Sequence, residues 1–233
     1  MIEAVLKQAT ISQDERINWI GSIPIILMHL GCFAAIWTGV DGRAIALFLI
    51  TFWVRMFSIT GGYHRYFAHR TFKTSRIFQF LLAFVGTTAS QKGPLWWAGH
   101  HRIHHRFSDQ PEDRHSPKQR GIWFAHIGWI LCDKYKDTPV ETIRDFAKYP
   151  ELLWLNRYWA VPPTILAIAT LLIGGWSGFV WGFVISTVAL WHATFVINSF
   201  AHTIGRRRYD TADTSRNNWA FALLTMGEGW HNN

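Results

Sequence analysis

Four apolar runs constrain the fold of this chain more than any other feature. Residues 19–39 carry no formal charge, and residues 44–62 are interrupted only by Arg55. Residues 160–174 and 179–200 are also apolar and are separated by a short uncharged loop. A helix needs roughly 20 apolar residues to cross the hydrocarbon core of a bilayer. The runs therefore predict an all-α integral membrane protein with four transmembrane helices.

The loops inside each pair of runs are short, so the four helices should form two hairpins. The chain between the hairpins, 63–158, and the chain after them, 201–233, are more polar and should form a helical cap on one side of the membrane. Within this cap, the polar stretch 133–148 is expected to be a surface helix. We treat all 233 residues as a single domain.

The distribution of charge predicts the orientation. Of the 23 Lys and Arg residues, 15 lie between residues 64 and 158, four follow His202 and two precede residue 18. Basic residues favour the cytoplasmic side of a membrane protein, which places both termini and the cap in the cytoplasm. The net charge of +8 then belongs to a face suited to anionic lipids or an acidic partner, and no nucleic acid is expected to bind.

Histidines are concentrated in this predicted cap. His100, His101, His104 and His105 fall within six positions. On a helix, His101, His104 and His105 lie at i, i+3 and i+4 and project within about 100° of arc. Three imidazoles on one face are suited to holding a transition metal.

Four more histidines fall on the same predicted side of the membrane, just beyond helix ends. The full set of candidate ligands is His64, His69, His101, His104, His105, His202 and His231. Seven imidazoles exceed what one ion needs, so the set predicts two metal ions. Neutral nitrogen ligands suit iron, zinc or copper.

Two spacings in this set need separate comment. His64 and His69 are five residues apart, which is about 140° around a regular helix, so they should not face one ion from such a helix. They would either flank two ions or straddle a helix end. Asn198 lies four residues before His202 and shares its helix face, so it could assist a ligand or orient a water molecule.

A carboxylate-bundle metal site would use two Glu-x-x-His pairs, and the chain contains Glu112/His115 and Glu228/His231. Glu112 follows Pro111 in an expected loop, and the further glutamate-bearing helices are missing, so this alternative is disfavoured. The other histidines are expected to be packed or hydrogen-bonded rather than metal-bound: His29, His100, His115, His126 and His192.

Four motifs in order resemble the histidine boxes of membrane fatty acid desaturases, specifically the stearoyl (delta-9) acyl-CoA type. They are HRYFAH at 64–69, HRIHH at 101–105, INSFAH at 197–202 and GEGWHNN at 227–233. The resemblance extends from about residue 20 to the last residue.

This resemblance implies a cytoplasmic cap over a dinuclear iron centre held by the seven histidines, with Asn198 reaching a metal through water. It further implies O₂ as co-substrate and two electrons from an external ferredoxin or b-type cytochrome. The substrate would be a long-chain acyl-CoA or another acyl carrier or lipid, which gains a cis double bond at position 9. Trp97, Phe195 and Lys134 would contact it.

The chain departs from the family pattern in two places. The third box in the family reads His-x-x-His-His, and this chain stops at Asn233 before the last two histidines, so we expect the natural gene to continue. Animal enzymes place Arg-Asp before the second box to contact the CoA head group, where this chain has Gly99 and His100. Phe195 and Asp133 likewise replace a Trp and an Arg, which leaves the head group open.

Two other functions remain as alternatives. A related membrane hydroxylase acting on alkanes or carotenoids has similar histidine boxes, although the INSFAH and GEGWHNN contexts favour a desaturase. A membrane metal transporter should carry its ligands at mid-membrane depth, whereas these histidines cluster beyond helix ends. Both are less favoured than fatty acyl desaturation.

Overall fold

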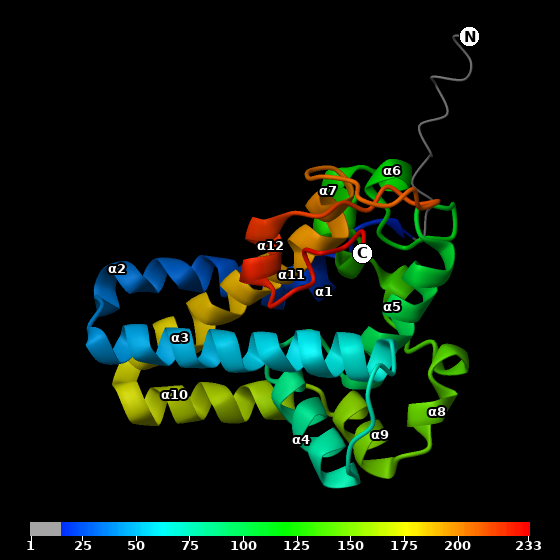
Figure 1. The fold of residues 1–233 in the computed structure, drawn as a ribbon. Coiled ribbons are helices and arrows are strands. Elements are labelled where there is room, and N and C mark those ends of the chain that lie inside the picture. Colours follow the sequence, from blue (N-terminus) through cyan, green and yellow to red (C-terminus); the bar gives the residue numbers. More distant parts are fainter. Residues whose placement is uncertain (1–14) are drawn as a thin grey trace.

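A computed structural model describes residues 15–233, and among these the regular structure is helical throughout (Figure 1). Long helical rods extend to one side, and shorter helices gather at the other end around α5. The all-α prediction is therefore confirmed. The polar residues 1–18 are expected from their sequence to be partly helical, and residues 1–14 lie outside the described residues.

The first apolar run forms one helical rod. It comprises α1 (Trp19–Gly31), the 3-10 turn η2 (Cys32–Ala34) and α2 (Ala35–Thr38). The side chain of Asn18 caps this rod by accepting a hydrogen bond from the backbone N–H of Gly21. A second cap starts the return helix, because the Asp41 carboxylate accepts from the backbone N–H of Ala44.

The second apolar run forms a longer helix than the predicted 44–62, and its geometry changes along its length. α3 (Gly42–Phe57) continues without a break into the π-helix η3 (Ser58–Ala68). A π-helix closes its turns with i→i+5 hydrogen bonds, so each turn is wider than an α-helical one. The helix therefore extends past the apolar run and carries His64 in its final turns.

The third and fourth apolar runs form one helical stretch that bends back on itself. α10 (Val161–Phe179) contains Gly175, whose φ of 60° and ψ of −155° are not helical. A Cβ on Gly178 would lie 2.7 Å from the carbonyl oxygen of Thr170, so the chain after Gly175 packs back against the chain before it. Beyond the bend the chain continues through η7 (Val180–Ile185), α11 (Ser186–Ser199) and η8 (Phe200–His202).

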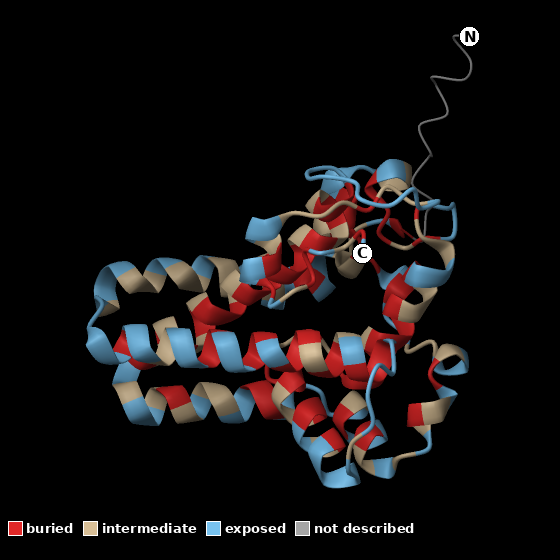
Figure 2. Cartoon of the chain, in the orientation of Figure 1, coloured by how far each residue is buried: buried red, intermediate tan, exposed pale blue. Residues whose placement is uncertain are grey.

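By length and composition, three helices in the described residues could cross a membrane. They are Trp19–Thr38, Gly42–Ala68 and Val161–His202, the last of which includes the bend at Gly175. Their outer surfaces are strongly apolar: Ile20 is 81% exposed, Trp37 80% and Leu172 80%. Figure 2 shows this exposure along the rods, whereas buried residues concentrate where rods and cap meet. Such surfaces suit contact with lipid rather than water.

Arg55 is the one charge inside the second apolar run, and it is buried. Its guanidinium donates to the backbone carbonyl of Thr51 and to the hydroxyls of Ser186 and Thr187. These bonds tie α3 to α11. Because each named partner is neutral, Arg55 joins the helices by hydrogen bonds rather than by an ion pair.

The cap is built from short helices around α5. Its elements are α4 (Arg76–Thr87), α5 (Pro94–Phe107), α6 (Pro117–Arg120), α7 (Ile122–His126), η4 (Gly128–Leu131), α9 (Pro150–Arg157) and α12 (Trp219–Leu224). α4 packs beside η3 and buries the ring of Tyr63 against Gly86, where an added Cβ would lie 2.5 Å from that ring, and α9 packs on α4 and α5.

The surface helix predicted over 133–148 is wrong. That stretch contains three short turns, η5 (Asp133–Tyr135), η6 (Val140–Thr142) and α8 (Arg144–Ala147). Pro139 lacks a backbone N–H and cannot continue a helix. In addition, Arg102 of α5 donates hydrogen bonds to the Thr142 carbonyl and to the Asp145 carboxylate. These bonds attach the segment to α5.

Candidate metal centre

Seven histidines from four parts of the chain converge into two adjacent groups. We call His64, His69, His101 and His105 the first histidine group, and His104, His202 and His231 the second histidine group. Within each group, all the candidate ligand atoms lie within 4.8 Å of one another. These are the seven histidines that the sequence proposed, and the structure brings all of them together.

The π-helix explains how His64 and His69 reach the same group. His64 lies in the last turns of η3, and His69 follows at its C-terminal cap, where its backbone N–H donates to the carbonyl of His64. This i→i+5 bond places one ring above the other, and their Nε2 atoms lie 3.0 Å apart. The pair does not lie on a regular helix, so the expectation based on one does not apply, and the structure shows the alternative in which the pair straddles a helix end.

α5 serves both groups. His101 and His105 are one turn apart on a regular α-helix, and their Nε2 atoms lie 2.9 Å apart in the first histidine group. His104 projects to the neighbouring side, and its ring centroid lies 5.6 Å from that of His202 in the second histidine group. The three imidazoles predicted to share one face are thus divided between two groups.

In three of these rings, a buried carboxylate lies near the nitrogen that faces away from the groups. Nδ1 of His104 lies 2.8 Å from Oδ1 of Asp113, and Nδ1 of His202 lies 3.5 Å from Oδ2 of Asp109. Nδ1 of His64 lies 3.6 Å from Oε1 of Glu228, which is too far for a hydrogen bond. Metal-bound histidines usually donate their other N–H to a carboxylate in this manner, which fixes the tautomer and the ring orientation.

This orientation leaves nitrogen lone pairs pointing at one another. A neutral His104 that donates from Nδ1 has only a lone pair on Nε2. Nε2 of His202 and Nε2 of His231 lie 3.1 Å apart, and Nε2 of His69 and Nε2 of His101 lie 3.3 Å apart. Lone pairs converge at such distances at little cost when a cation lies between them.

The spacing also matches a metal. Metal–nitrogen bonds of 2.0–2.1 Å in a tetrahedral arrangement separate neighbouring nitrogens by about 3.3 Å, close to the 2.9–3.3 Å found in these groups. Burial, reinforced by neighbouring histidines, lowers the pKa of His105 to about 3 and holds the pKa of His101 and of His231 well below the ordinary value. Neutral imidazole, the form that binds metal, is therefore present at pH 7.

The carboxylate-bundle alternative does not form. Glu112 is exposed in its loop, and Glu228 lies 3.6 Å from the outward nitrogen of His64 and belongs to no candidate metal group in the described residues. Burial raises the pKa of Glu228 to about 7. Within the described residues, Asp113 is the single carboxylate in any candidate metal group, with His104 and His115, and its oxygen bonds to Nδ1 of His104.

The remaining histidines mostly follow the expectation that they are packed or hydrogen-bonded. His100 faces away from both groups and bonds to the Asp137 carbonyl and to Arg114. His29, His126 and His192 bond to one another. His115 differs, because it is buried 4.2 Å from the ring of His104 (centroid to centroid) and its Nδ1 has no hydrogen-bond partner.

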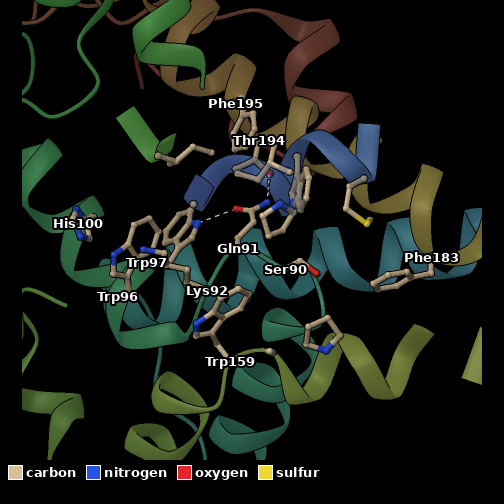
Figure 3. Close-up of a pocket in the computed structure, with 18 of the residues that line it drawn as sticks. Ser90, Gln91, Lys92, Trp96, Trp97, His100, Trp159, Phe183, Thr194 and Phe195 are labelled. Atoms are coloured by element: carbon tan, nitrogen blue, oxygen red, sulfur yellow. Dashed lines mark hydrogen bonds between the residues drawn. The ribbon is translucent and has the colours of Figure 1, made fainter. Parts of the chain in front are cut away.

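An apolar cavity of about 550 Å³ reaches the histidines (Figure 3). Its lining includes His101 and Asn198, and also Pro24 of α1 and Ile168 of α10. A cavity of this size accommodates a small organic ligand, and its lining is suited to an alkyl chain. Asn198 thus lines the same cavity as His101.

Hydrogen bonds fix the polar side chains along this cavity. Gln91 donates to the hydroxyl of Thr194 and accepts from the indole N–H of Trp97, both at 3.0 Å, as the dashed lines in Figure 3 show. Trp97 also stacks on His101, with centroids 4.8 Å apart. Trp97 and Phe195, two of the three candidate substrate contacts, line the cavity, whereas Lys134 lies outside this lining and binds the carboxylate of Glu15.

Comparison with known proteins identifies the family. The sequence model of the fatty acid desaturase family matches residues 42–233. The chain belongs to the fatty acid desaturase family. It is therefore a member of a family of membrane oxidoreductases, as the histidine boxes indicated.

Individual desaturases align over most of the chain. The sn-1 stearoyl-lipid 9-desaturase of Anabaena variabilis is 38% identical over 226 residues, which cover 95% of this chain and 82% of that protein. The acyl-CoA 5-desaturase AL21 of Anemone leveillei is 39% identical over 181 residues, which cover 76% of this chain and 56% of that protein. A chloroplastic palmitoyl-monogalactosyldiacylglycerol delta-7 desaturase of Arabidopsis thaliana is 33% identical over 98% of this chain and 65% of its own length.

Sequence reasoning missed several residues of this desaturase site. Asp109 and Asp113, which hold His202 and His104, follow the second box within eight positions of His105. That proximity was a usable signal, because metal-bound histidines commonly pair with carboxylates. Gln91 and Thr194 gave no comparable signal, since their contact joins residues more than a hundred positions apart.

Proposed function

We propose that this chain carries out O₂-dependent desaturation of a long-chain acyl group, with two iron ions held by the two histidine groups. The observation that carries the proposal is that the lining of the apolar cavity includes His101 of the first histidine group, together with Asn198. In this arrangement an alkyl chain entering the cavity presents a methylene to the metal centre. The seven histidines would hold the iron, and Asn198 would contact one ion through water.

The iron centre, when bound, supplies the oxidant that a strong alkyl C–H bond requires. The balance of the reaction is fixed by chemistry: two hydrogens leave the acyl chain, and O₂ takes up these together with two electrons and two protons to give two molecules of water. The electrons come from an external carrier, for which a ferredoxin or a b-type cytochrome is suited. The basic cap is suited to docking such an acidic protein.

The protein's own residues position the substrate. The Gln91 amide, which is fixed by Thr194 and Trp97, is a rigid polar group in the mainly apolar lining of the cavity. The walls on either side hold the alkyl chain and keep water from the reacting carbons. Holding the chain in one register determines which carbons are presented to the metal.

We propose position 9 for the double bond, and a bilayer lipid or an acyl-CoA as the substrate that carries the acyl chain. Relatives with high identity include 9-desaturases of lipid-linked stearoyl groups, and also 5- and 7-desaturases. The 9-desaturase of Anabaena variabilis combines 38% identity with coverage of 95% of this chain, which supports position 9.

We further propose that the bend at Gly175 makes two membrane spans of the third candidate helix. The chain would then cross the membrane four times in two hairpins, with the cap and both termini on the cytoplasmic side. Two observations support this topology: the close packing of Gly178 on Thr170, and the concentration of basic residues in the cap.

The test is expression of the complete gene in cells that cannot make unsaturated fatty acids, together with a ferredoxin and its reductase. Gas chromatography should reveal new mid-chain monoenes. His104→Ala should abolish them, whereas Glu151→Gln, which changes an ion pair with Arg76 away from the cavity, should leave them. Hydroxylated products would assign the chain to the hydroxylases instead. A well-expressed, iron-loaded chain that yields no monoene would refute the proposal.

A further inference from the structure

The apolar cavity that His101 lines is bounded partly by the helices whose outer surfaces suit lipid. Its lining includes residues of α1, among them Gly21 and Pro24, and residues of α10, among them Thr164 and Ile168. Both helices belong to candidate membrane spans. The cavity therefore extends into the part of the molecule that a bilayer would surround.

The cavity is open to the exterior on one side, and only exposed residues can form the rim of an opening. All the exposed residues of the lining lie near the start of α1 or near the start of α10: Gly21, Pro24, Trp159, Ala160, Thr164 and Ile168. Phe195 is buried in the lining, and in Figure 3 it lies across the cavity from Trp159. The opening therefore lies mainly between α1 and α10.

The two helices that flank this opening pack on η7 and not on each other. A Cβ on Gly31 of α1 would lie 3.2 Å from the side chain of Val184, and a Cβ on Gly182 would lie 3.1 Å from the side chain of Thr170 in α10. Among the described residues, α1 and α10 form no comparable packing with one another. Gly31 and Thr170 follow the lining residues along their helices, so both helices close on η7 beyond the cavity and stay apart beside it.

The opening spans the depth at which a lipid chain lies. Trp19 starts α1 and is 69% exposed, and Trp159, two residues before α10, is 39% exposed. Tryptophans of this kind are typical of the membrane interface. Ile168 lies seven residues after Val161, the first residue of α10, which is roughly 10 Å along the helix axis. A chain that lies in the bilayer can therefore reach the opening without leaving the hydrocarbon.

The charge of the lining favours a lipid over a CoA ester. Among the described residues of the lining, Lys92 is the single Lys, Arg, Asp or Glu. Its Nζ already donates to the carbonyl oxygen of Lys136 and lies 4.3 Å from the ring centroid of Trp96. The CoA head group carries several phosphate charges, which suit clusters of arginine and lysine. A membrane lipid can leave its head group in the interface, so only an alkyl chain has to enter the cavity.

We propose that the opening between α1 and α10 is a lateral portal through which the acyl chain of an intact bilayer glycerolipid enters the cavity. The inference rests on the proposed function and narrows its substrate to a lipid-linked chain. We call Gly21, Pro24, Thr164 and Ile168 the portal rim. The head group stays at the interface, and the chain passes between the two helices into the cavity that His101 lines. Entry forms and breaks no covalent bond.

The first test detects the chain inside the cavity and does not depend on turnover. The complete, iron-loaded protein is placed, without an electron donor, in nanodiscs of phosphatidylglycerol that carries a mid-chain diazirine on one stearoyl group. After illumination, peptide mass spectrometry locates the adducts. Adducts on Trp191 and Phe195, the buried cavity rings, report entry. Adducts on Leu172, which is 80% exposed and outside the lining, report contact with the bilayer and serve as the reference.

Bulky side chains in the portal rim should block entry. Thr164→Trp and Ile168→Trp each place an indole beside the opening, so the adducts on the buried cavity rings should be lost and the reference adducts should persist. Ile165→Trp is the matched control, because Ile165 is the next residue of the same helix, is 49% exposed and lies outside the lining. It should keep both sets of adducts. Absence of cavity adducts in the native protein would overturn the portal, as would their persistence in both rim variants.

A second label tests the other source of the chain. Stearoyl-CoA with the same diazirine is supplied from solution to nanodiscs of unlabelled phosphatidylglycerol. At equal amounts of label, the lipid should mark the buried cavity rings more strongly than the CoA ester does. An equal or greater yield of cavity adducts from the CoA ester would refute the assignment to a lipid-linked chain.

Turnover separates the portal from the proposed function. With a ferredoxin and its reductase added, the native protein and Ile165→Trp should convert stearoyl groups of the nanodisc lipid to monoenes, and the two rim variants should lose this activity. If the native protein makes no monoene but the lipid label reaches the buried cavity rings, the proposed function fails and the portal stands as a lipid-binding site. If both rim variants make monoenes at the native rate, the portal is refuted and the desaturase function stands.

Discussion

Asp113→Asn is the sharpest test of how this metal centre is held. The Asp113 carboxylate is fully buried and accepts three hydrogen bonds. Nδ1 of His104 donates at 2.8 Å, the backbone N–H of Asp109 at 2.9 Å and the backbone N–H of His115 at 3.2 Å. Asparagine has the same shape but only one oxygen, so it cannot satisfy the donors on both sides.

The expected losses of stability and of metal affinity follow from the two orientations that the new amide can take. If its oxygen faces His104, its NH₂ group opposes the N–H of Asp109, and a buried unpaired donor costs about 1–3 kcal/mol. If the amide is flipped, His104 loses its acceptor or changes tautomer, which removes the lone pair offered to the second histidine group. Loss of such a support typically lowers metal affinity about 10–100-fold. Because Asp109 also contacts His202, both orientations disturb the second histidine group.

The assay is metal content at controlled free metal. Native protein and Asp113→Asn are equilibrated with chelator-buffered Fe²⁺, separated from free metal and analysed for iron per chain. At a free concentration where the native protein holds two ions, the variant should hold one. The second histidine group should empty first, because the first group does not contact Asp113. Glu151→Gln, which weakens the surface pair with Arg76, is the control and should retain two.

Equal iron occupancy in Asp113→Asn and in the native protein across the whole range of buffered Fe²⁺ would refute the reasoning. It would mean that the His104–Asp113 contact does not set the tautomer or orientation of the ligand. Loss of both ions together, with an unchanged melting temperature, would contradict the assignment of two separate groups.

Three further predictions concern the rest of the fold. Hydrogen bonds and charge from Arg120, Lys134 and Tyr135 outweigh the effect of burial and hold the pKa of Glu15 below its usual 4.5, so Glu15→Gln should lower stability by about 3–5 kcal/mol at neutral pH. Because a depressed folded-state pKa stabilises only above the unfolded value, this difference should shrink as pH falls below 4.5, as measured by chemical unfolding at each pH. Gly86→Ala forces a methyl group against the ring of Tyr63 and should cost about 1–3 kcal/mol, seen as a lower melting temperature that Gly42→Ala, in open space, does not reproduce. Arg55→Ala leaves a cavity and two hydroxyls without their donor, so detergent-solubilised protein should lose about 2–5 kcal/mol, whereas an unchanged melting temperature would show that Arg55 does not tie α3 to α11.

Local sequence patterns were sufficient for much of the fold. The apolar runs predicted the long helices because hydrophobic length depends only on neighbours in sequence. The i, i+4 spacing of His101 and His105 predicted their shared site for the same reason, since α5 is a regular helix. The seven-histidine set also emerged because its members lie near the ends of recognisable elements.

The rest depended on contacts between distant residues. The change from α to π geometry at Ser58 has no local marker, so the sequence left open how His64 and His69 meet. The division of α5 between two groups depends on where His202 and His231 arrive from elsewhere in the chain. The polarity of the stretch around Pro139 led to the prediction of a helix. The stretch instead forms short turns that are hydrogen-bonded to Arg102, more than thirty positions away in sequence.

The two helices that supply the first histidine group also give a rule for building such a site elsewhere. His101 and His105 meet across four residues on an α-helix, whereas His64 and His69 meet across five on a π-helix. A designer who moves the His64–His69 pair onto an ideal α-helical scaffold must therefore delete one intervening residue, and one who keeps the five-residue spacing must also transplant the wider turn. The spacing of a histidine box thus encodes the kind of helix on which it can work.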